Sequence, residues 1–174
     1  MKNLLLFLVF ACTFSFSCLG SPVPFSPIVR NYSVLDYNAG NENWAVAQDE
    51  RGVMYFGNNS GLLRYDGSRW KLFPLPTSGI VRAVYVASDR RIYVGSFEEF
   101  GYFEQNDLNL LEYHSLKEQV KGFDFHNDEI WTIVEQGGNI IFQSFGSYFI
   151  YDGKGRKGVR CPELPLNLFR IGDT

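Results

Sequence analysis

One sequence pattern occurs three times along this chain of 174 residues, and this repetition limits the possible folds more than any other feature. Positions of the first copy recur in the second at a constant spacing: Val46 and Gly57 fall on Val84 and Gly95. At a second constant spacing, positions of the first copy recur in a third: Trp44, Val53 and Tyr55 fall on Trp131, Ile140 and Phe142. The run Tyr65-Asp66-Gly67 reappears one residue earlier in phase, as Tyr151-Asp152-Gly153.

Each copy reads as three or four short alternating strands, close to the length of about 40–50 residues that is typical of a β-propeller blade. A blade cannot bury both of its apolar faces alone, so the copies are expected to stack around a common axis. We therefore predict an all-β fold, a partial β-propeller of about three four-stranded blades. Because propellers close with about four to eight blades, the ring is expected to stay open in this chain.

Turn residues between the alternating runs predict the organisation of the chain. The expected segments are a signal peptide (1–20), an extended lead with one strand (21–43), blade 1 (44–79), blade 2 with a connector (80–121), blade 3 (122–166) and the start of a truncated fourth blade (167–174). The strand in the lead is expected at Tyr32–Leu35, and residues 114–121 are expected to include a short helical turn. The chain thus reads as the front of a longer protein.

The first twenty residues have the composition of a secretory signal peptide. Lys2 supplies the positive charge, residues 4–16 are mostly apolar, and Cys18-Leu19-Gly20 offers small residues for cleavage. The apolar run is shorter than the ~20 residues that a membrane span needs. We expect export to the periplasm; a lipoprotein signal at Cys18 is an alternative. Cleavage would leave Cys161 as the one cysteine, so we expect no internal disulfide.

Four stretches outside the third copy carry a family resemblance: YNAGNENW (37–44), GNNSGLLRYDG (57–67), RIYVGS (91–96) and EFGY (99–102). Together with the third copy, they resemble the two-component-regulator propeller family of Gram-negative bacteria, as an N-terminal fragment. The resemblance implies a periplasmic sensor for breakdown products of polysaccharides. It also implies that a full-length relative has more blades, an immunoglobulin-like domain, a membrane helix and a kinase or helix-turn-helix output part.

Several motifs suggest chemistry at first sight, but each has a simpler structural interpretation. The run Gly153–Gly158 spells G-x-G-x-x-G, yet Pro162 follows too soon for the helix that a dinucleotide site requires, so we expect a basic hairpin turn. Glu98 and Glu99 are adjacent and would point to opposite faces of a strand, which disfavours an acid/base pair. We therefore predict no catalytic residue and no cofactor.

Metal and nucleic-acid binding are also disfavoured. His114 and His126 are the only histidines and have no set of partners at metal-ligand spacing, so we predict no metal site. The net charge of −3 gives no basic surface for nucleic acid. Asp66 and Asp152 precede glycines in predicted hairpins, where Asp suits the turn backbone.

Three equivalent positions are the candidate ligand-binding residues: Trp44, Arg82 and Trp131. In a propeller, the innermost strands surround the central channel, so their ends lie at its mouth. Aromatic faces can stack on sugar rings, and Arg can bond hydroxyls or carboxylates. The alternative is that the tryptophans fill the space between blades and that Arg82 only covers them.

These observations together predict a non-enzymatic, exported sensor that binds an oligosaccharide-like ligand. One alternative is a secreted propeller lyase or hydrolase that acts on carbohydrate, and another is a truncated gene product without function. The exposed edge strands also predict association with the remaining blades or with a second copy of the chain.

Overall fold

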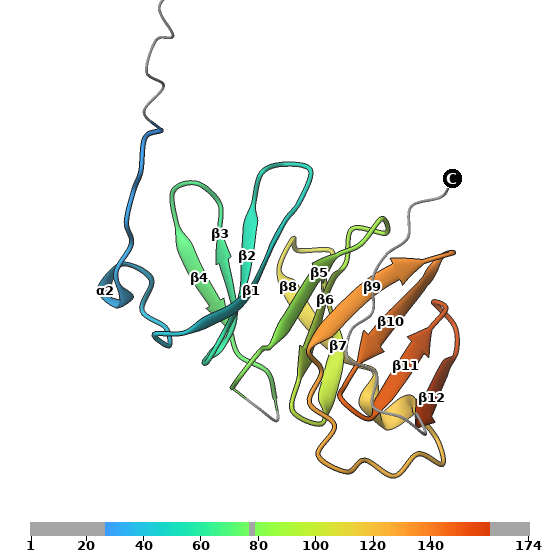
Figure 1. Cartoon of the computed structure of the whole chain (residues 1–174). Helices are drawn as coiled ribbons and strands as arrows, with labels where there is room; N and C mark the ends of the chain where they lie inside the picture. The colour runs from blue at the N-terminus through green and yellow to red at the C-terminus, as the bar shows by residue number, and fades with distance from the viewer. Residues whose placement is uncertain (1–26, 77–78, 161–174) are drawn as a thin grey trace, which may run out of the picture. The chain divides into compact units, whose positions relative to one another are not determined.

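The computed structural model describes residues 27–76 and 79–160, and it contains three four-stranded antiparallel sheets (Figure 1). Blade 1 comprises β1 (Asn43–Gln48), β2 (Met54–Asn58), β3 (Gly61–Tyr65) and β4 (Trp70–Phe73). Blade 2 comprises β5 (Ala83–Val86), β6 (Ile92–Ser96), β7 (Glu99–Gln105) and β8 (Leu111–Ser115). Blade 3 comprises β9 (Thr132–Gln136), β10 (Asn139–Gln143), β11 (Ser147–Tyr151) and β12 (Arg156–Arg160). The predicted all-β fold of four-stranded blades in an open arrangement is confirmed.

The strands of every blade follow one another in sequence order, and the first strand of each blade lies next to the first strand of the neighbouring blade. Figure 1 shows the three sheets side by side, with β5 between β1 and β9. Equivalent backbone hydrogen bonds join the blades: Val81 N–H donates to Asn58 O at 3.0 Å, and Ile130 N–H donates to Ser96 O at 2.9 Å. The sequence repeat is therefore also a repeat of the contacts between blades.

The repeated glycines allow the blades to approach each other. A Cβ on Gly57 would lie 2.7 Å from the carbonyl oxygen of Val81, and a Cβ on Gly95 would overlap the side chain of Ile130. A Cβ atom does not approach other heavy atoms this closely, so a larger side chain at either position would push the blades apart. The pattern Gly57/Gly95 thus records the close contact of one blade with the next, and not a turn.

Two apolar clusters hold the blades together. Between blades 1 and 2, Leu62, Val81 and Val94 have no exposed surface. Between blades 2 and 3 the core is aromatic, and the ring of Phe100 lies 4.9 Å from that of Phe142 and 4.8 Å from that of Phe149. Full burial of such side chains contributes about 1.5–3 kcal/mol each, so these clusters account for part of the high aromatic content of the chain.

The pairing register corrects one predicted equivalence. In blade 1, Val46 pairs with Phe56, but in blade 3 the equivalent Ile133 pairs with Phe142. The β9–β10 hairpin is one residue shorter because Gly137 and Gly138, with φ of +57° and +77°, form a two-residue turn.

Phe142 is therefore equivalent to Phe56 and not to Tyr55, and the predicted match of Val53 with Ile140 is wrong for the same reason. A shift of one residue moves a side chain to the other face of a strand. The later match of Tyr65 with Tyr151 already includes this shift.

The expected strand at Tyr32–Leu35 is wrong. Val34–Tyr37 instead forms the one-turn helix α2. Ser33 begins the turn, since its backbone N–H and its hydroxyl donate to the Asp36 carboxylate at 2.6 and 2.8 Å, and this local bonding replaces a strand ladder. Asn38 ends the turn in the left-handed conformation, with φ of +48°.

The segment around α2 covers the face of blade 1 that points away from blade 2. The rings of Tyr32 and Tyr37 lie 5.1 and 5.5 Å from that of Trp70, which also stacks on Tyr65 at 4.4 Å. Trp70 and Tyr65 pair across β3 and β4 on the face opposite to Leu62. Residues of the lead thus bury aromatic side chains that the sheet alone would expose.

Other predictions concern the connector and the chain ends. The helical turn expected within 114–121 is confirmed as η1 (Lys117–Gln119). Among the described residues, no helix is both long and apolar enough for a bilayer crossing. The predicted signal peptide, Cys161 and the predicted fourth blade lie outside the described residues.

Candidate functional site

The three predicted ligand-binding residues lie together at one end of the inner strands. Trp44 is in β1, Arg82 directly precedes β5, and Trp131 directly precedes β9. The Arg82 guanidinium carbon lies 3.8 Å from the centroid of the Trp44 ring and 5.0 Å from that of Trp131. The two indole rings meet edge to face at 6.1 Å. The constant spacing of the repeat therefore places the guanidinium between two tryptophans.

Backbone hydrogen bonds fix the position of this group. The backbone N–H of Arg82 donates to Gly95 O at 2.8 Å, and that of Trp131 donates to Gln143 O at 2.9 Å. Each residue is thus tied to the second strand of its own blade. The side chains are presented from the start of paired strands or from the residue directly before them.

Glu129 provides the counter-charge for Arg82. The Arg82 Nε–H donates to Glu129 Oε1 at 2.6 Å, and these side chains are 15% and 22% exposed. The Nη1 atom of Arg82 and the indole Nε1 of Trp131 are buried and have no hydrogen-bond partner within the described ranges. The site therefore combines an ion pair, two aromatic rings and two unused donors.

A second set of equivalent residues surrounds this group, one in the turn after the second strand of each blade: Asn59, Phe97 and Phe145. The indole N–H of Trp44 donates to Asn59 Oδ1 at 2.7 Å, and the Phe145 ring lies 5.7 Å from that of Trp131. Phe97 pairs with Glu129 through an isolated backbone bridge.

We call these residues the rim: Trp44, Asn59, Arg82, Phe97, Glu129, Trp131 and Phe145. Three rings of the rim expose much of their surface, at 43% for Trp44, 47% for Phe97 and 60% for Phe145. Sequence analysis missed Phe97 and Phe145. The constant spacing between the first two copies relates Asn59 to Phe97, so it could have identified Phe97. Phe145 lies one residue before the position that the spacing between the first and third copies gives, because the β9–β10 hairpin is shorter.

Solved structures share this arrangement of blades. The structure of the chain superposes on virginiamycin B lyase from Staphylococcus aureus (TM-score 0.54, 13% identity, 70% of this chain and 42% of that chain). It also superposes on a streptogramin B lyase (TM-score 0.57, 17% identity, covering 77% of this chain and 44% of that chain). A third match is the extracellular domain of a putative hybrid two-component system from B. thetaiotaomicron (TM-score 0.53, 18% identity, covering 73% of this chain and 17% of that chain).

The described blades share the fold of these solved structures. This fold is shared by enzymes and by the extracellular domain of the putative two-component system. The chain spans less than half of the length of each of these structures. No protein-family model and no curated protein sequence matches the chain.

Outside the rim, the adjacent carboxylates of Glu98 and Glu99 bond to different parts of the chain. Glu99 is 3% exposed and accepts hydrogen bonds from the Tyr113 hydroxyl at 2.7 Å and the Ser115 hydroxyl at 2.8 Å. Burial first, and then the nearby Glu99 charge, raise the pKa of Tyr113 well above its usual value of about 10. Glu98 lies in the turn and accepts from the backbone of Asn127 at 3.0 Å. The pair does not converge on one point.

The remaining motifs have structural roles. The run Gly153–Gly158 comprises the turn between β11 and β12 and the first residues of β12, so the interpretation as a hairpin is confirmed. Asp66 accepts from the backbone of Ser68 and Arg69 at 3.1 and 2.9 Å, and these bonds lower its pKa to about 2. The described part of the chain holds no group of three or more His, Cys, Asp or Glu that is suited to a metal ion.

Proposed function

We propose that this chain is the ligand-binding part of an exported sensor and that it binds an oligosaccharide-like ligand at the rim. The observation that carries the proposal is the convergence of Trp44, Arg82 and Trp131 with the exposed ring of Phe145. The propeller fold of an extracellular domain in a putative hybrid two-component system supports a sensor role.

The rim suits the chemistry of a sugar. One face of Trp44 is covered by Arg82, while the exposed part of its ring and that of Phe145 are free to stack on the apolar faces of sugar rings. The guanidinium of Arg82 and the side chain of Asn59 place polar groups beside these rings. The remaining blades, or a second copy of the chain, would enlarge this surface.

Calorimetric titration tests the proposal directly. The chain from residue 21 onward is titrated with a panel of polysaccharide oligomers, and we expect one class to bind. Trp44→Ala should weaken that binding by about two- to thirteenfold, because stacking on an aromatic ring is worth about 0.5–1.5 kcal/mol beyond the area it buries. Leu108→Ala is the matched control, since Leu108 is 78% exposed and lies in the β7–β8 turn, away from the rim. Failure of a folded sample to bind any oligomer would refute the proposal.

The second candidate is a lyase, because two of the matched structures are lyases. Such a role needs a free acid or base near the ligand. The two carboxylates next to the rim tryptophans are engaged, Glu129 by Arg82 at 2.6 Å and Glu42 by Asn59 at 2.9 Å. Mass spectrometry of oligomers incubated with the chain distinguishes the two functions: new products would favour the lyase, and intact bound oligomers the sensor.

A further inference from the structure

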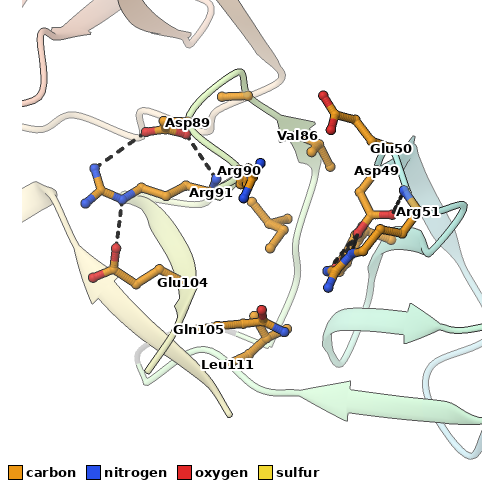
Figure 2. Close-up of a pocket in the computed structure, with 13 residues that line it drawn as sticks. Asp49, Glu50, Arg51, Val86, Asp89, Arg90, Arg91, Glu104, Gln105 and Leu111 are labelled. Carbon is orange, nitrogen blue, oxygen red and sulfur yellow. Dashed lines mark hydrogen bonds and ion pairs between the residues drawn. The ribbon is translucent and has the colours of Figure 1, made fainter. Parts of the chain in front are cut away.

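A cavity of about 610 Å³ lies between blades 1 and 2, at the end of the inner strands opposite to the rim (Figure 2). Trp44 is near the start of β1, whereas the cavity lies at the other end of the inner strands. It is lined by residues 49–51, which follow the end of β1, and by residues 86, 87 and 89–92 around the β5–β6 turn. Its volume is within the range of about 300–1,000 Å³ that is typical of small-molecule sites. The rim and the cavity are thus separate features.

Comparison with the next pair of blades explains why this cavity is open. Between blades 2 and 3, the Ser88 backbone N–H donates to Glu135 Oε2 at 3.0 Å, and the Ser88 hydroxyl donates to Glu135 Oε1. The repeat places Val86 where blade 3 has Glu135, and Glu50 where blade 2 has Ser88. The side chain of Val86 cannot accept a hydrogen bond as Glu135 does, so this bond between turns is missing here and the space between them stays open.

Most charges in the cavity wall are paired. Arg51 contacts Asp49 at 3.1 Å, and Arg91 contacts Glu104 at 2.8 Å and Asp89 at 3.5 Å. Figure 2 shows the Asp49–Arg51 pair on one side of the cavity and the Asp89–Arg91–Glu104 group on the other. Each of these charged side chains is therefore already paired with a neighbour on its own wall of the cavity.

Two charges of opposite sign remain. Glu50 and Arg90 line the same cavity, both are exposed, and neither side chain has an ion-pair or hydrogen-bond partner among the residues that the structure describes. The apolar part of the wall includes Val86, Ala87, Ile92 and Leu111. The cavity therefore offers one cation, one anion and an apolar surface.

We propose that this cavity binds a small zwitterion with an apolar side chain, such as a free amino acid or a dipeptide. The guanidinium fork of Arg90 suits a carboxylate, and the carboxylate of Glu50 suits an ammonium group. The side chain of the ligand lies against Val86 and its apolar neighbours. This site is independent of the oligosaccharide site at the rim and takes a different class of ligand.

Titration of the full chain with four probes tests the proposal. L-leucine and the dipeptide Gly-Leu carry both charges, N-acetyl-leucine lacks the ammonium group, and leucinamide lacks the carboxylate. Each charged hydrogen bond is worth about 1.5–3 kcal/mol, so the zwitterions should bind at least about tenfold more tightly than either single-charge analogue. Absence of binding by both zwitterions, or equal binding of all four probes, overturns the proposal.

Variants then locate the binding. Arg90→Gln and Glu50→Gln should each lower the affinity for L-leucine by about tenfold. The double variant Glu50→Ser with Val86→Glu recreates the bond found between blades 2 and 3, so it should close the cavity and abolish binding. Trp44→Ala at the rim should leave binding unchanged. If the double variant does not fold, Arg90→Gln decides, and unchanged affinity in that variant overturns the proposal.

Discussion

Replacement of Arg82 by Met should destabilise the propeller by about 3–4.5 kcal/mol. The ion pair with Glu129 at 2.6 Å is about four-fifths buried, and a hydrogen bond between charged groups contributes about 1.5–3 kcal/mol. The contact with the Trp44 ring at 3.8 Å adds about 1 kcal/mol, and the contact with Trp131 at 5.0 Å adds about 0.5 kcal/mol. Met has an apolar side chain of similar length, so most of the packing is retained. The lost free energy of unfolding therefore measures the contribution of the guanidinium charge.

A double-mutant cycle in urea separates these contributions. Unfolding of the chain from residue 21 is followed by tryptophan fluorescence for the parent, Arg82→Met, Glu129→Gln and the double variant. Since the two side chains are in direct contact, we expect a coupling energy of about 1–3 kcal/mol. Arg82→Lys is the control, because it keeps the charge but loses the planar fork. A loss below about 0.5 kcal/mol in Arg82→Met, or additive effects in the cycle, would refute this account of the site.

Three further predictions concern the blades. Gly95→Ala should destabilise the fold by about 1–3 kcal/mol in urea denaturation, because its Cβ overlaps Ile130. Asp66 has a pKa of about 2 in the folded chain. Its contribution to stability is therefore complete above the unfolded pKa of about 3.9 and is lost as the pH falls towards 2. In Asp66→Asn, the melting temperature should depend less on pH between about 4 and 2. Tyr113→Phe should cost about 1–3 kcal/mol, because the buried Glu99 loses a donor, and it should remove part of the stability loss seen as the pH rises above about 10.

Matched variants control these experiments. Gly155→Ala adds a Cβ that meets only Asp152 at 3.7 Å. Tyr148→Phe removes the hydroxyl of a half-buried side chain in β11 for which the described residues provide no hydrogen-bond partner. Both should change stability by less than about 0.5 kcal/mol. Effects as large as those of Gly95→Ala or Tyr113→Phe would contradict the explanations from steric overlap and buried hydrogen bonding.

The sequence predicted the features that depend on the spacing of the repeat. The convergence of Trp44, Arg82 and Trp131 follows from that constant spacing, because the inner strands of adjacent blades start at equivalent points. The close packing at Gly57 and Gly95 has the same origin. Both features are set by one contact between blades that recurs with each copy.

Features that depend on a single local bond were missed. The register of Phe142 depends on the length of one glycine turn, and a constant spacing alone cannot show where a residue is lost. The helix at Val34–Tyr37 replaces the expected strand because Ser33 bonds to the Asp36 carboxylate, a short-range contact that overrides the alternating pattern of the lead. The partner of Arg82, Glu129, lies 47 residues away, and no motif connects them.

The aromatic cover of Trp70 affects how the protein can be made. Tyr32 and Tyr37 precede blade 1 in the chain, so they are synthesised before the surface that they shield. A newly made first blade can therefore hide its outer rings as soon as β4 is complete, without waiting for another sheet.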